Sequence, residues 1–221
     1  ISLVVDQKSN DNPVENFGIR PLPNLEAKFV AANTLIGLNK KDTSLFDRAE
    51  IKAKESELKI AKHKIFGAKT VRTKRKYRQI VNDLRLEIAK MLEDCGAVGN
   101  AEAQQLAAWD MFDQNVSSPF FDPEWMFNVK DGFDIVIGNP PYVLLQNTNI
   151  SASEKRKMIS MYCVAQYKVD LYHLFYEKAL DILRLKGVLC YITPIAFLKN
   201  IHNDRLRKLL ATRSSIQIVI R

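Results

Sequence analysis

A short apolar run that ends abruptly in a stiff polar loop constrains this chain more than any other stretch. Ile135 to Ile137 has the length and the β-branched side chains of a buried parallel strand. Gly138 ends the run, and the chain continues as Asn139-Pro140-Pro141-Tyr142. Open α/β sheets bind their ligands at the carboxyl ends of such strands. The pattern therefore predicts an α/β fold with a functional loop at residues 139–142.

The residue types of this loop suit an amine substrate. Pro140 and Pro141 fix φ and remove two N–H donors, so the loop presents carbonyl acceptors. Asn139 adds a side-chain acceptor. Two fixed acceptors suit an exocyclic amine or a primary amide, and they favour a pyramidal nitrogen whose lone pair is free to attack. Tyr142 supplies a flat face for a base that has left its helix. A plain tight turn is the alternative, since turns also favour Asn and Pro.

The chain around the loop resembles a known family. Asp134 to Tyr142, DIVIGNPPY, resembles the catalytic motif (motif IV) of S-adenosylmethionine (SAM) dependent amino-methyltransferases. The longer stretch from Phe120 to Val143, with FFDPEWMF before GFDIVIGNPPYV, resembles the N6-adenine DNA methyltransferase module of combined type IIG restriction–modification enzymes. The resemblance spans nearly the whole chain. It implies a partial SAM-methyltransferase (Rossmann-like) sheet, with SAM as cofactor and double-stranded DNA as partner.

The resemblance also implies roles for individual residues. In the loop, Asn139 and the Pro140 carbonyl would hold the adenine amine, Pro141 would keep the loop rigid, and Tyr142 would stack on the flipped base. Residues 23–36 resemble the family's third motif, a strand whose last polar residue approaches the adenine of SAM. Asn33 would take that role, in place of the Asp of many relatives. A strand-end cap is the alternative reading of Asn33.

A second segment resembles the fifth motif of the family. Residues 170–184 form an amphipathic pattern with Leu171, Leu174/Phe175 and Ala179 on the inward face. The first Asp and the Phe of that motif lie near the cofactor, which makes Asp170 and Phe175 candidate cofactor residues. An ordinary core helix explains both equally well.

The basic charge of the chain is concentrated in one segment. The net charge is +8, and residues 52–78 hold 11 Lys/Arg against Glu55 and Glu57, so the remainder sums to about −1. Phosphate neutralisation dominates nucleic-acid affinity, which favours polyanion binding. A solvated helix face is the alternative. The candidate nucleic-acid residues are Lys69, Arg72, Lys74, Arg75, Lys76 and Arg78.

This segment has the pattern of a long α-helical hairpin inserted between the third motif and the catalytic loop. Thr43 or Ser44 is a good N-cap, and no Pro follows until Pro119. Phe66-Gly67 marks a bend and Gly96 a C-cap. Apolar stripes are predicted at Leu45, Ile51, Leu58 and Ile65, and at Tyr77, Val81, Leu84, Ile88, Met91 and Cys95.

The rest of the chain alternates helix and strand, which argues for a right-handed βαβ sheet. Helices are predicted from Asn100 to about Phe112, over residues 154–162 and over residues 203–210, and strands over residues 188–192 and 216–220. We expect three parts: a partial methyltransferase core (1–43), the basic hairpin (44–99) and a catalytic α/β part (100–221).

Composition excludes several classes of function. No apolar run approaches the length of a membrane span. The three cysteines are widely separated and the three histidines do not cluster, so we expect neither disulfides nor a metal site. These features, with the absence of a secretory leader, predict a cytoplasmic protein.

The glycine loop and the ribose-binding acid of the family's SAM pocket do not occur upstream of Asn33. We therefore expect a piece of a longer enzyme that lacks the upstream SAM-binding and downstream target-recognition parts. In the family's strand order the missing first strand lies beside the catalytic one, so the resemblance implies a long apolar edge left exposed. We expect this piece to be inactive alone, and either rearranged or self-associated along that edge.

The sequence favours the catalytic half of an adenine-N6 DNA methyltransferase. The parent chain of such a module often also cleaves DNA, which the sequence leaves open. Glutamine methyltransferases, which carry a similar Asn-Pro-Pro-Tyr, are an alternative enzyme class. A non-catalytic scaffold that binds nucleic acid through the helical hairpin is the alternative outside enzymes.

Overall fold

The computed structural model describes residues 8–18, 28–38, 45, 48–113 and 115–220. It divides into two compact units. The first holds the described residues of 1–32 and 38–119, and the second holds 33–37 and 120–220. The helix start predicted at Thr43 or Ser44 lies outside the described residues.

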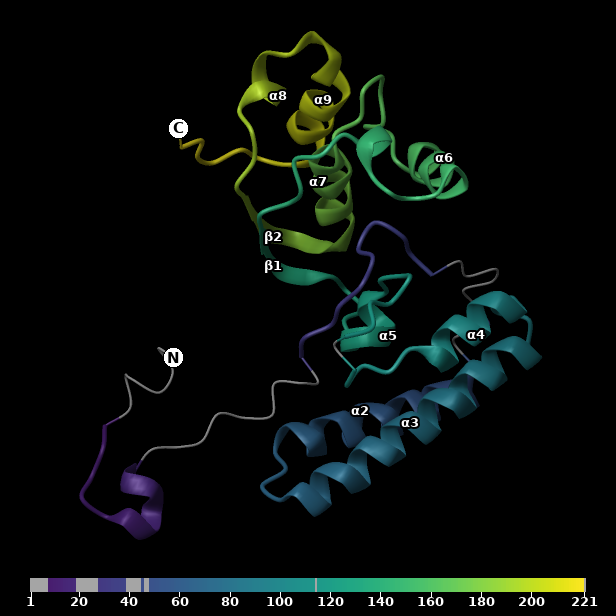
Figure 1. Ribbon diagram of the computed structural model, residues 1–221, viewed down its shortest axis with the longest axis vertical. Helices are drawn as coiled ribbons and strands as arrows, with labels where there is room; N and C mark the ends of the chain where they lie inside the picture. The colour runs from purple at the N-terminus through teal and green to yellow at the C-terminus, as the bar shows by residue number, and fades with distance from the viewer. Residues whose placement is uncertain (1–7, 19–27, 39–44, 46–47, 114, 221) are drawn as a thin grey trace. The chain divides into compact units, whose positions relative to one another are not determined.

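Two long helices dominate the first unit. α2 (Ala49–Phe66) and α3 (Val71–Asp94) lie side by side and run in opposite directions (Figure 1). Gly67 is the C-cap of α2, and Gly96 follows α3 with a φ of 78°, as the sequence predicted. Thr70 caps α3 by accepting a hydrogen bond from the N–H of Thr73. Most of the predicted stripes are buried, namely Ile51, Leu58, Ile65, Val81, Leu84 and Ile88.

A buried arginine ties α3 to α4 (Asn100–Ala108). The Arg85 guanidinium donates to the carbonyls of Leu106, at 3.2 Å, and Ala107, at 3.4 Å, and it lies over the Trp109 ring. Burial lowers the pKa of Arg85. The predicted helix from Asn100 to about Phe112 was wrong at its end, because Trp109 already has an extended backbone and leaves the helix.

The second unit contains a two-stranded parallel sheet. β1 (Phe133–Gly138) pairs with β2 (Leu183–Tyr191), and the chain between them includes α6 (Ala152–Met161) and α7 (Leu171–Ile182). The parallel strand predicted at residues 135–137 is therefore confirmed, but its predicted burial was wrong, because Ile135 and Ile137 are exposed on the face that α7 does not cover. Gly132 directly precedes β1 and has a φ of 89°. A Cβ at this position would lie 2.5 Å from the backbone nitrogen of Arg184. Only glycine permits this close approach of the two strands.

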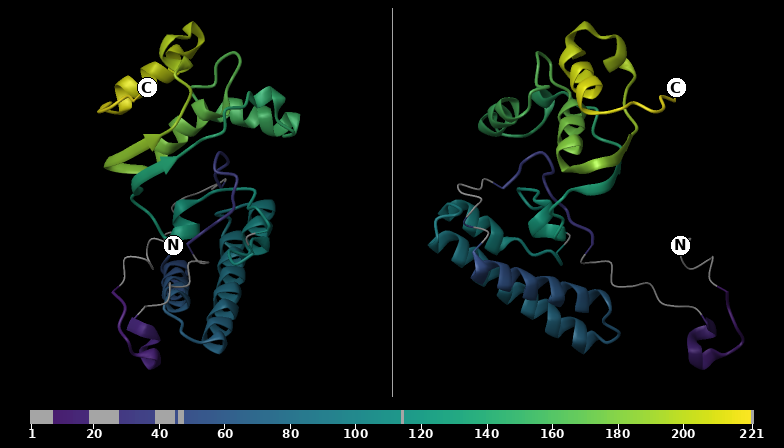
Figure 2. Two further views of the ribbon diagram at one scale, coloured as in Figure 1. Left: turned by 60° about the vertical axis from the view of Figure 1, so that its left-hand side comes forward. Right: turned by 180° about the vertical axis from the view of Figure 1, so that it is seen from behind.

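Helices cover one face of this sheet. α7 packs against β2 and against α9 (Asp204–Arg213), as two views of the unit show (Figure 2). Leu189 and Tyr191 of β2 contact the core cluster that includes Leu174 and Leu209. The short helices α5 (Pro123–Phe127), η4 (Leu145–Asn147), α8 (Ala196–Lys199) and η5 (Ile201–Asn203) complete the unit, and η1 (Pro13–Gly18) precedes it in the chain.

The opposite face of the sheet is apolar and exposed. Ile135 pairs with Val188, and Ile137 pairs with Cys190. All four side chains are exposed, because none of the described residues packs over them. Together with Ile192, they form an uncovered apolar surface on the two strands.

Several strand predictions were wrong. The described part of the third-motif strand predicted at residues 23–36, namely residues 28–36, contains an isolated bridge between Ala32 and Ser118 in place of a strand, and residues 23–27 lie outside the described residues. Residues 216–220 are extended and exposed but form no strand, since their backbone groups meet no partner strand in the described part of the chain. β2 begins at Leu183 and not at Val188, with an irregular register between the two and Lys186 at a φ of 63°.

No helix in the described ranges combines the length and the apolar character needed to cross a bilayer.

Candidate active site

The Asn139–Tyr142 loop follows directly from the carboxyl end of β1. Pro140 is buried, whereas Asn139 and Pro141 are exposed. The backbone N–H of Ile192 donates to the Gly138 carbonyl at 3.1 Å, so the chain after β2 continues to pair beside the start of the loop. The loop therefore lies at the end of the sheet where α/β proteins bind ligands.

The Tyr142 hydroxyl forms hydrogen bonds to another residue of the loop and to the chain that follows β2. This hydroxyl lies 2.5 Å from Oδ1 of Asn139 and 2.6 Å from the carbonyl oxygen of Ile192. Both oxygens are acceptors, so the single phenol proton is shared between them or serves one at a time. The hydroxyl thus occupies one of the two lone-pair positions on the Asn139 oxygen. The Tyr142 side chain is 46% exposed.

The downstream end of the loop is fixed against the start of α7. The Leu145 N–H donates to the Val169 carbonyl at 2.8 Å, and the Leu171 N–H donates to the Val143 carbonyl at 2.9 Å. These two bonds form an antiparallel bridge between Leu144 and Asp170. Asp170, a candidate cofactor residue, is thereby held next to the Asn139–Tyr142 loop.

A series of aromatic ring contacts runs from Tyr142 to β2 within the second unit. The Tyr142 ring meets the edge of the Tyr172 ring at a centroid distance of 6.2 Å. Tyr172 is buried and contacts Tyr176 on the same helix, and Tyr176 contacts Tyr191 of β2. Burial raises the pKa of Tyr172 to about 12. The sequence analysis missed these contacts, although the spacing of Tyr172 and Tyr176 by four residues places them on one helix face.

α7 is also more buried than the amphipathic pattern indicated. Besides the predicted inward residues Leu171, Leu174 and Ala179, the side chains of Tyr172, His173, Tyr176 and Glu177 are buried. Phe175 is only half-buried and packs at the margin of the core cluster. The predicted polar face of the helix is therefore largely covered.

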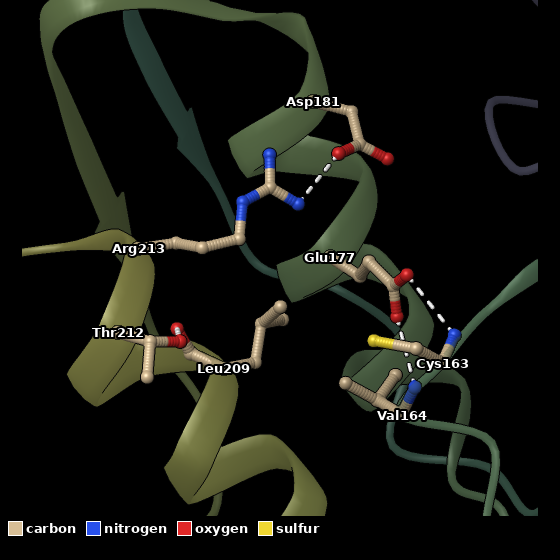
Figure 3. A network of polar contacts seen from close by, with 7 residues as sticks. All are labelled: Cys163, Val164, Glu177, Asp181, Leu209, Thr212 and Arg213. Carbon is tan, nitrogen blue, oxygen red and sulfur yellow. Dashed lines mark hydrogen bonds and ion pairs between the residues drawn. The ribbon is translucent and has the colours of Figure 1, made fainter.

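The Glu177 carboxylate fixes the loop that leads to Asp170. Its two oxygens accept hydrogen bonds from the backbone N–H groups of Cys163, at 3.0 Å, and Val164, at 2.9 Å (Figure 3). On the same helix Asp181 pairs with Arg213 of α9. A buried carboxylate that accepts two backbone hydrogen bonds holds this loop firmly.

The candidate cofactor residues all lie in the second unit. Asp170 is the N-cap residue of α7, but its side chain makes no capping hydrogen bond. Burial raises the pKa of its carboxyl. Asn33 lies before a turn in which its carbonyl accepts from the Ile36 N–H, and Tyr162 reaches the same segment by donating to the Leu35 carbonyl. The Asn33 segment is therefore attached to the unit that carries the loop.

Comparison with known proteins assigns the family. The model described as Eco57I restriction-modification methylase matches residues 32–221, which is most of the chain. The chain belongs to this family.

Three relatives of this Eco57I-family chain illustrate its similarity to longer enzymes. It is 33% identical over 89 residues to the type II restriction enzyme and methyltransferase RM.Eco57I of Escherichia coli. It is 33% identical over 91 residues to the type II methyltransferase M.BstVI of Geobacillus stearothermophilus, and 32% over 94 residues to M.HincII of Haemophilus influenzae. The matches cover 40, 40 and 41% of this chain but only 9, 15 and 18% of the relatives.

The basic residues of this Eco57I-family chain do not share one environment. Lys69, Arg72, Arg75 and Lys76 are exposed at the turn and the first part of α3. Lys74 is half-buried. Arg78 is also half-buried and lies over the Phe112 ring at 5.0 Å from its centroid. The first four residues are therefore the accessible cations of the predicted set.

The carboxyl groups of Asp122 and Glu124 have local structural roles at α5. Asp122 accepts a hydrogen bond from the Trp125 N–H and caps α5, and Glu124 pairs with Lys130. Among the described residues, no group of three or more His, Cys, Asp or Glu side chains is arranged to hold a metal ion.

Proposed function

We propose that this chain is the catalytic part of a DNA methyltransferase that transfers a methyl group from SAM to N6 of an adenine flipped out of the duplex. The observation that carries the proposal is the Asn139–Tyr142 loop at the carboxyl end of β1. Its Asn139 oxygen already accepts a hydrogen bond from a donor, the Tyr142 hydroxyl at 2.5 Å. Membership of the Eco57I restriction-modification methylase family supports the same reaction class.

In this proposal the loop's own groups act on the amine. The Asn139 oxygen and the Pro140 carbonyl each accept one N–H of the adenine amine, which turns the nitrogen lone pair out of the ring plane. The Tyr142 hydroxyl gives up its bond to Asn139, and its ring stacks on the base. Pro141 keeps the Pro140 carbonyl in place. The two acceptors would stabilise the positive charge that develops on the amine as its bond to the methyl group forms and the bond from that methyl group to the cofactor's sulfur breaks, with a neutral thioether as the leaving group. The methylated amine would then lose one proton to water, which leaves a neutral N6-methyladenine.

SAM would supply the electrophilic methyl group. The residues proposed to hold it are Asp170, Asn33 and Phe175. Asp170 fits a donor-rich cofactor, because its partly buried carboxyl makes no capping hydrogen bond and lies beside the loop through the Leu144–Asp170 bridge. Asn33 offers both a donor and an acceptor.

The parts beyond this chain belong to the proposal as well. The chain matches less than a fifth of each relative's length, so we propose that further parts of a longer parent complete the SAM pocket and read the DNA sequence. In such a parent the exposed cations at the turn before α3 and in its first part, namely Lys69, Arg72, Arg75 and Lys76, would contact the DNA backbone.

The glutamine-methylating alternative has less support. It accounts for the Asn-Pro-Pro-Tyr loop, since the lone pair of an amide nitrogen is delocalised, as it is in an aromatic amine, and must likewise be made free to attack. It does not account for the exposed cations of Lys69, Arg72 and Arg75. The names of the relatives also describe a type II restriction enzyme and type II methyltransferases.

The test of the proposal is Asn139→Ala in a parent-length enzyme. Methyl transfer to DNA should fall at least about a hundredfold, the scale on which a single preorganised polar group contributes to catalysis. Asn149→Ala, at another exposed asparagine after the loop, should retain activity. Full activity of Asn139→Ala would overturn the proposal.

A further inference from the structure

Tyr167 is exposed in a backbone conformation that tyrosine seldom adopts. Its φ is 46°, in the left-handed region, and its side chain is 71% exposed. Such a conformation is costly for a bulky side chain and is typical of functional positions. Burial does not explain it, because the ring is directed mostly into solvent.

The Tyr167 ring is part of an exposed aromatic and cationic cluster. It stacks on the His202 ring at a centroid distance of 4.9 Å and a tilt of 36°. The Lys168 ammonium lies 5.8 Å from the Tyr167 centroid. These residues come from two loops that lie 35 positions apart in the sequence, and both His202 and Lys168 are exposed. We call Tyr167, Lys168 and His202 the ring cluster.

Two arginines of α9 fix the loops that carry the ring cluster. Arg205 donates to the carbonyls of Cys163 and Ala165, at 3.5 and 3.3 Å. Arg207 donates to the carbonyls of Phe197 and Asn200, at 2.8 and 2.6 Å. The first loop is also held by Glu177. Both loops are therefore held by charged side chains, so the cluster is preorganised.

Side-chain contacts connect the ring cluster to the catalytic loop. Tyr142 contacts the ring of Tyr172, and the Tyr172 hydroxyl interacts with the buried side chain of Asn203. Asn203 directly follows His202 in the chain. Tyr167 also lies shortly before Asp170 in the chain, and the backbone of Asp170 forms an antiparallel bridge with Leu144, which follows the loop. The ring cluster is therefore connected to the Asn139–Tyr142 loop through the Tyr172 side chain and through the Leu144–Asp170 bridge.

The surroundings of the cluster carry a positive charge. Residues 163–168 and 196–208 contain five basic side chains and one acidic one, Asp204, while Asp170 and the buried Glu177 are the acidic groups next to the first loop, so the basic side chains still outnumber the acidic ones. An exposed ring, an adjacent ammonium and a surplus of cations are the features that bind nucleic acid by stacking and phosphate contact. An acidic protein surface would use the cations but would not require the exposed ring.

We propose that the ring cluster is a DNA contact connected to the Asn139–Tyr142 loop, in which Tyr167 stacks on a base of the distorted strand and Lys168 contacts a phosphate. The inference rests on the proposed function, because it takes DNA as the substrate. It adds a DNA-binding element outside both the catalytic loop and the basic helix α3.

The test is DNA binding by the 221-residue chain, measured by fluorescence anisotropy over a series of salt concentrations. The probe is a duplex that carries one mismatched adenine. Tyr167→Asn is the key variant, since asparagine tolerates the left-handed backbone while it removes the ring. Its affinity should fall about tenfold, with an unchanged salt dependence. Tyr167→Phe, which keeps the ring, should bind like the wild type.

Lys168→Ala should reduce the slope of log affinity against log salt by about 0.9, the value for one phosphate that is no longer neutralised. The controls are Phe17→Ala, which removes a half-exposed ring elsewhere, and Lys90→Ala, which removes an exposed cation on α3. Both should leave binding at the cluster unchanged.

The outcomes separate this inference from the proposed function. If the wild type binds DNA and Tyr167→Asn binds equally well, the ring cluster is not a DNA contact, and the methyltransferase proposal stands. If the wild type does not bind the duplex at all, DNA as the partner of this chain fails, and the inference fails with it. Equal losses in Tyr167→Asn and Phe17→Ala would also overturn the inference.

Discussion

The Tyr142 hydroxyl and the proposed substrate amine would both use the Asn139 side-chain oxygen as their acceptor. The hydroxyl occupies a lone pair of the Asn139 oxygen, the acceptor that we assign to the substrate amine. The Tyr142 ring is the surface on which the base would stack. Entry of a base therefore exchanges the phenol O–H for an amine N–H at the same acceptor. The Asn139 oxygen is thus already engaged by a donor before the substrate arrives.

Substitutions of Tyr142 separate the role of its hydroxyl from that of its ring. Tyr142→Phe keeps the ring and loses the hydrogen bonds to Asn139 and Ile192, so kcat/KM for DNA methylation should stay within about tenfold of the wild type. Tyr142→Ala removes the stacking surface, worth about 1–3 kcal/mol, and should lower kcat/KM by roughly ten- to a hundredfold. Steady-state kinetics of a parent-length enzyme measure both. Equal losses in the two variants would contradict the assigned role of the ring.

His173 makes stability depend on pH. It is buried on α7, and burial lowers its pKa from 6.5 to about 4. Above pH 6.5 it is neutral in the folded and the unfolded chain. As the pH falls from 6.5 to 4, the unfolded chain gains a proton that the folded chain resists. The free energy of unfolding should therefore fall in this window, by up to about 3 kcal/mol.

Urea unfolding at pH 7 and at pH 4.5 measures this effect. His173→Leu removes the titrating group, so the variant should lose less stability between the two pH values than the wild type does. Circular dichroism at pH 7 checks that the variant is folded. The same pH dependence in both proteins would rule out His173 as its source.

The sequence predicted the loop better than its surroundings. Gly138 to Tyr142 is a local pattern, so its residue types predict its position after a strand and its stiffness. The bond from Tyr142 to the Ile192 carbonyl joins residues 50 positions apart. The residue types of the loop alone cannot predict this bond, because it forms only when β1 and β2 pair in parallel and bring Ile192 next to the loop.

At the scale of elements, the helices were predicted more reliably than the strands. The bend at Gly67 and the end of α3 before Gly96 follow from local backbone preferences. A strand needs a partner, and residues 216–220 have the pattern without one in the described part of the chain. The Tyr172 and Glu177 side chains were not among the predicted inward residues of α7, yet both are buried.

The exposed cations of α3 give a prediction at this scale. Reversing the charge of Lys69, Arg72 and Arg75 to Glu should weaken DNA binding and reduce the slope of its salt dependence by about 0.9 for each phosphate that is no longer neutralised. A single reversal at Lys90, an exposed cation near the other end of the same helix, should have little effect. Titrations of a DNA duplex at several salt concentrations provide the measurement. An unchanged salt slope in the triple variant would exclude α3 as a DNA-binding element.

For the molecule as a whole, the uncovered face of the sheet is the most consequential feature. Ile135, Ile137, Val188 and Ile192 are exposed on two strands that have no further partner strand among the described residues. Exposed apolar surface and free strand edges favour association. This surface supports the self-association that the sequence analysis predicted.

Light scattering over a range of concentrations tests this prediction. The average mass of the wild-type chain should rise with concentration. Ile137→Thr combined with Val188→Thr should shift the chain toward the monomer, because the double variant makes the face more polar. Ile216→Thr, at an exposed isoleucine outside the sheet, is the matched control. A wild-type chain that is monomeric at every concentration would refute the prediction.

The central claim is the chemical identity of the methylated product. A parent-length enzyme should be incubated with methyl-labelled SAM and duplex DNA, and the DNA should then be digested to nucleosides and separated by chromatography. The proposal predicts that the label is found in N6-methyladenine. Label in a cytosine nucleoside, or in a glutamine side chain of an added protein and not in DNA, would contradict it.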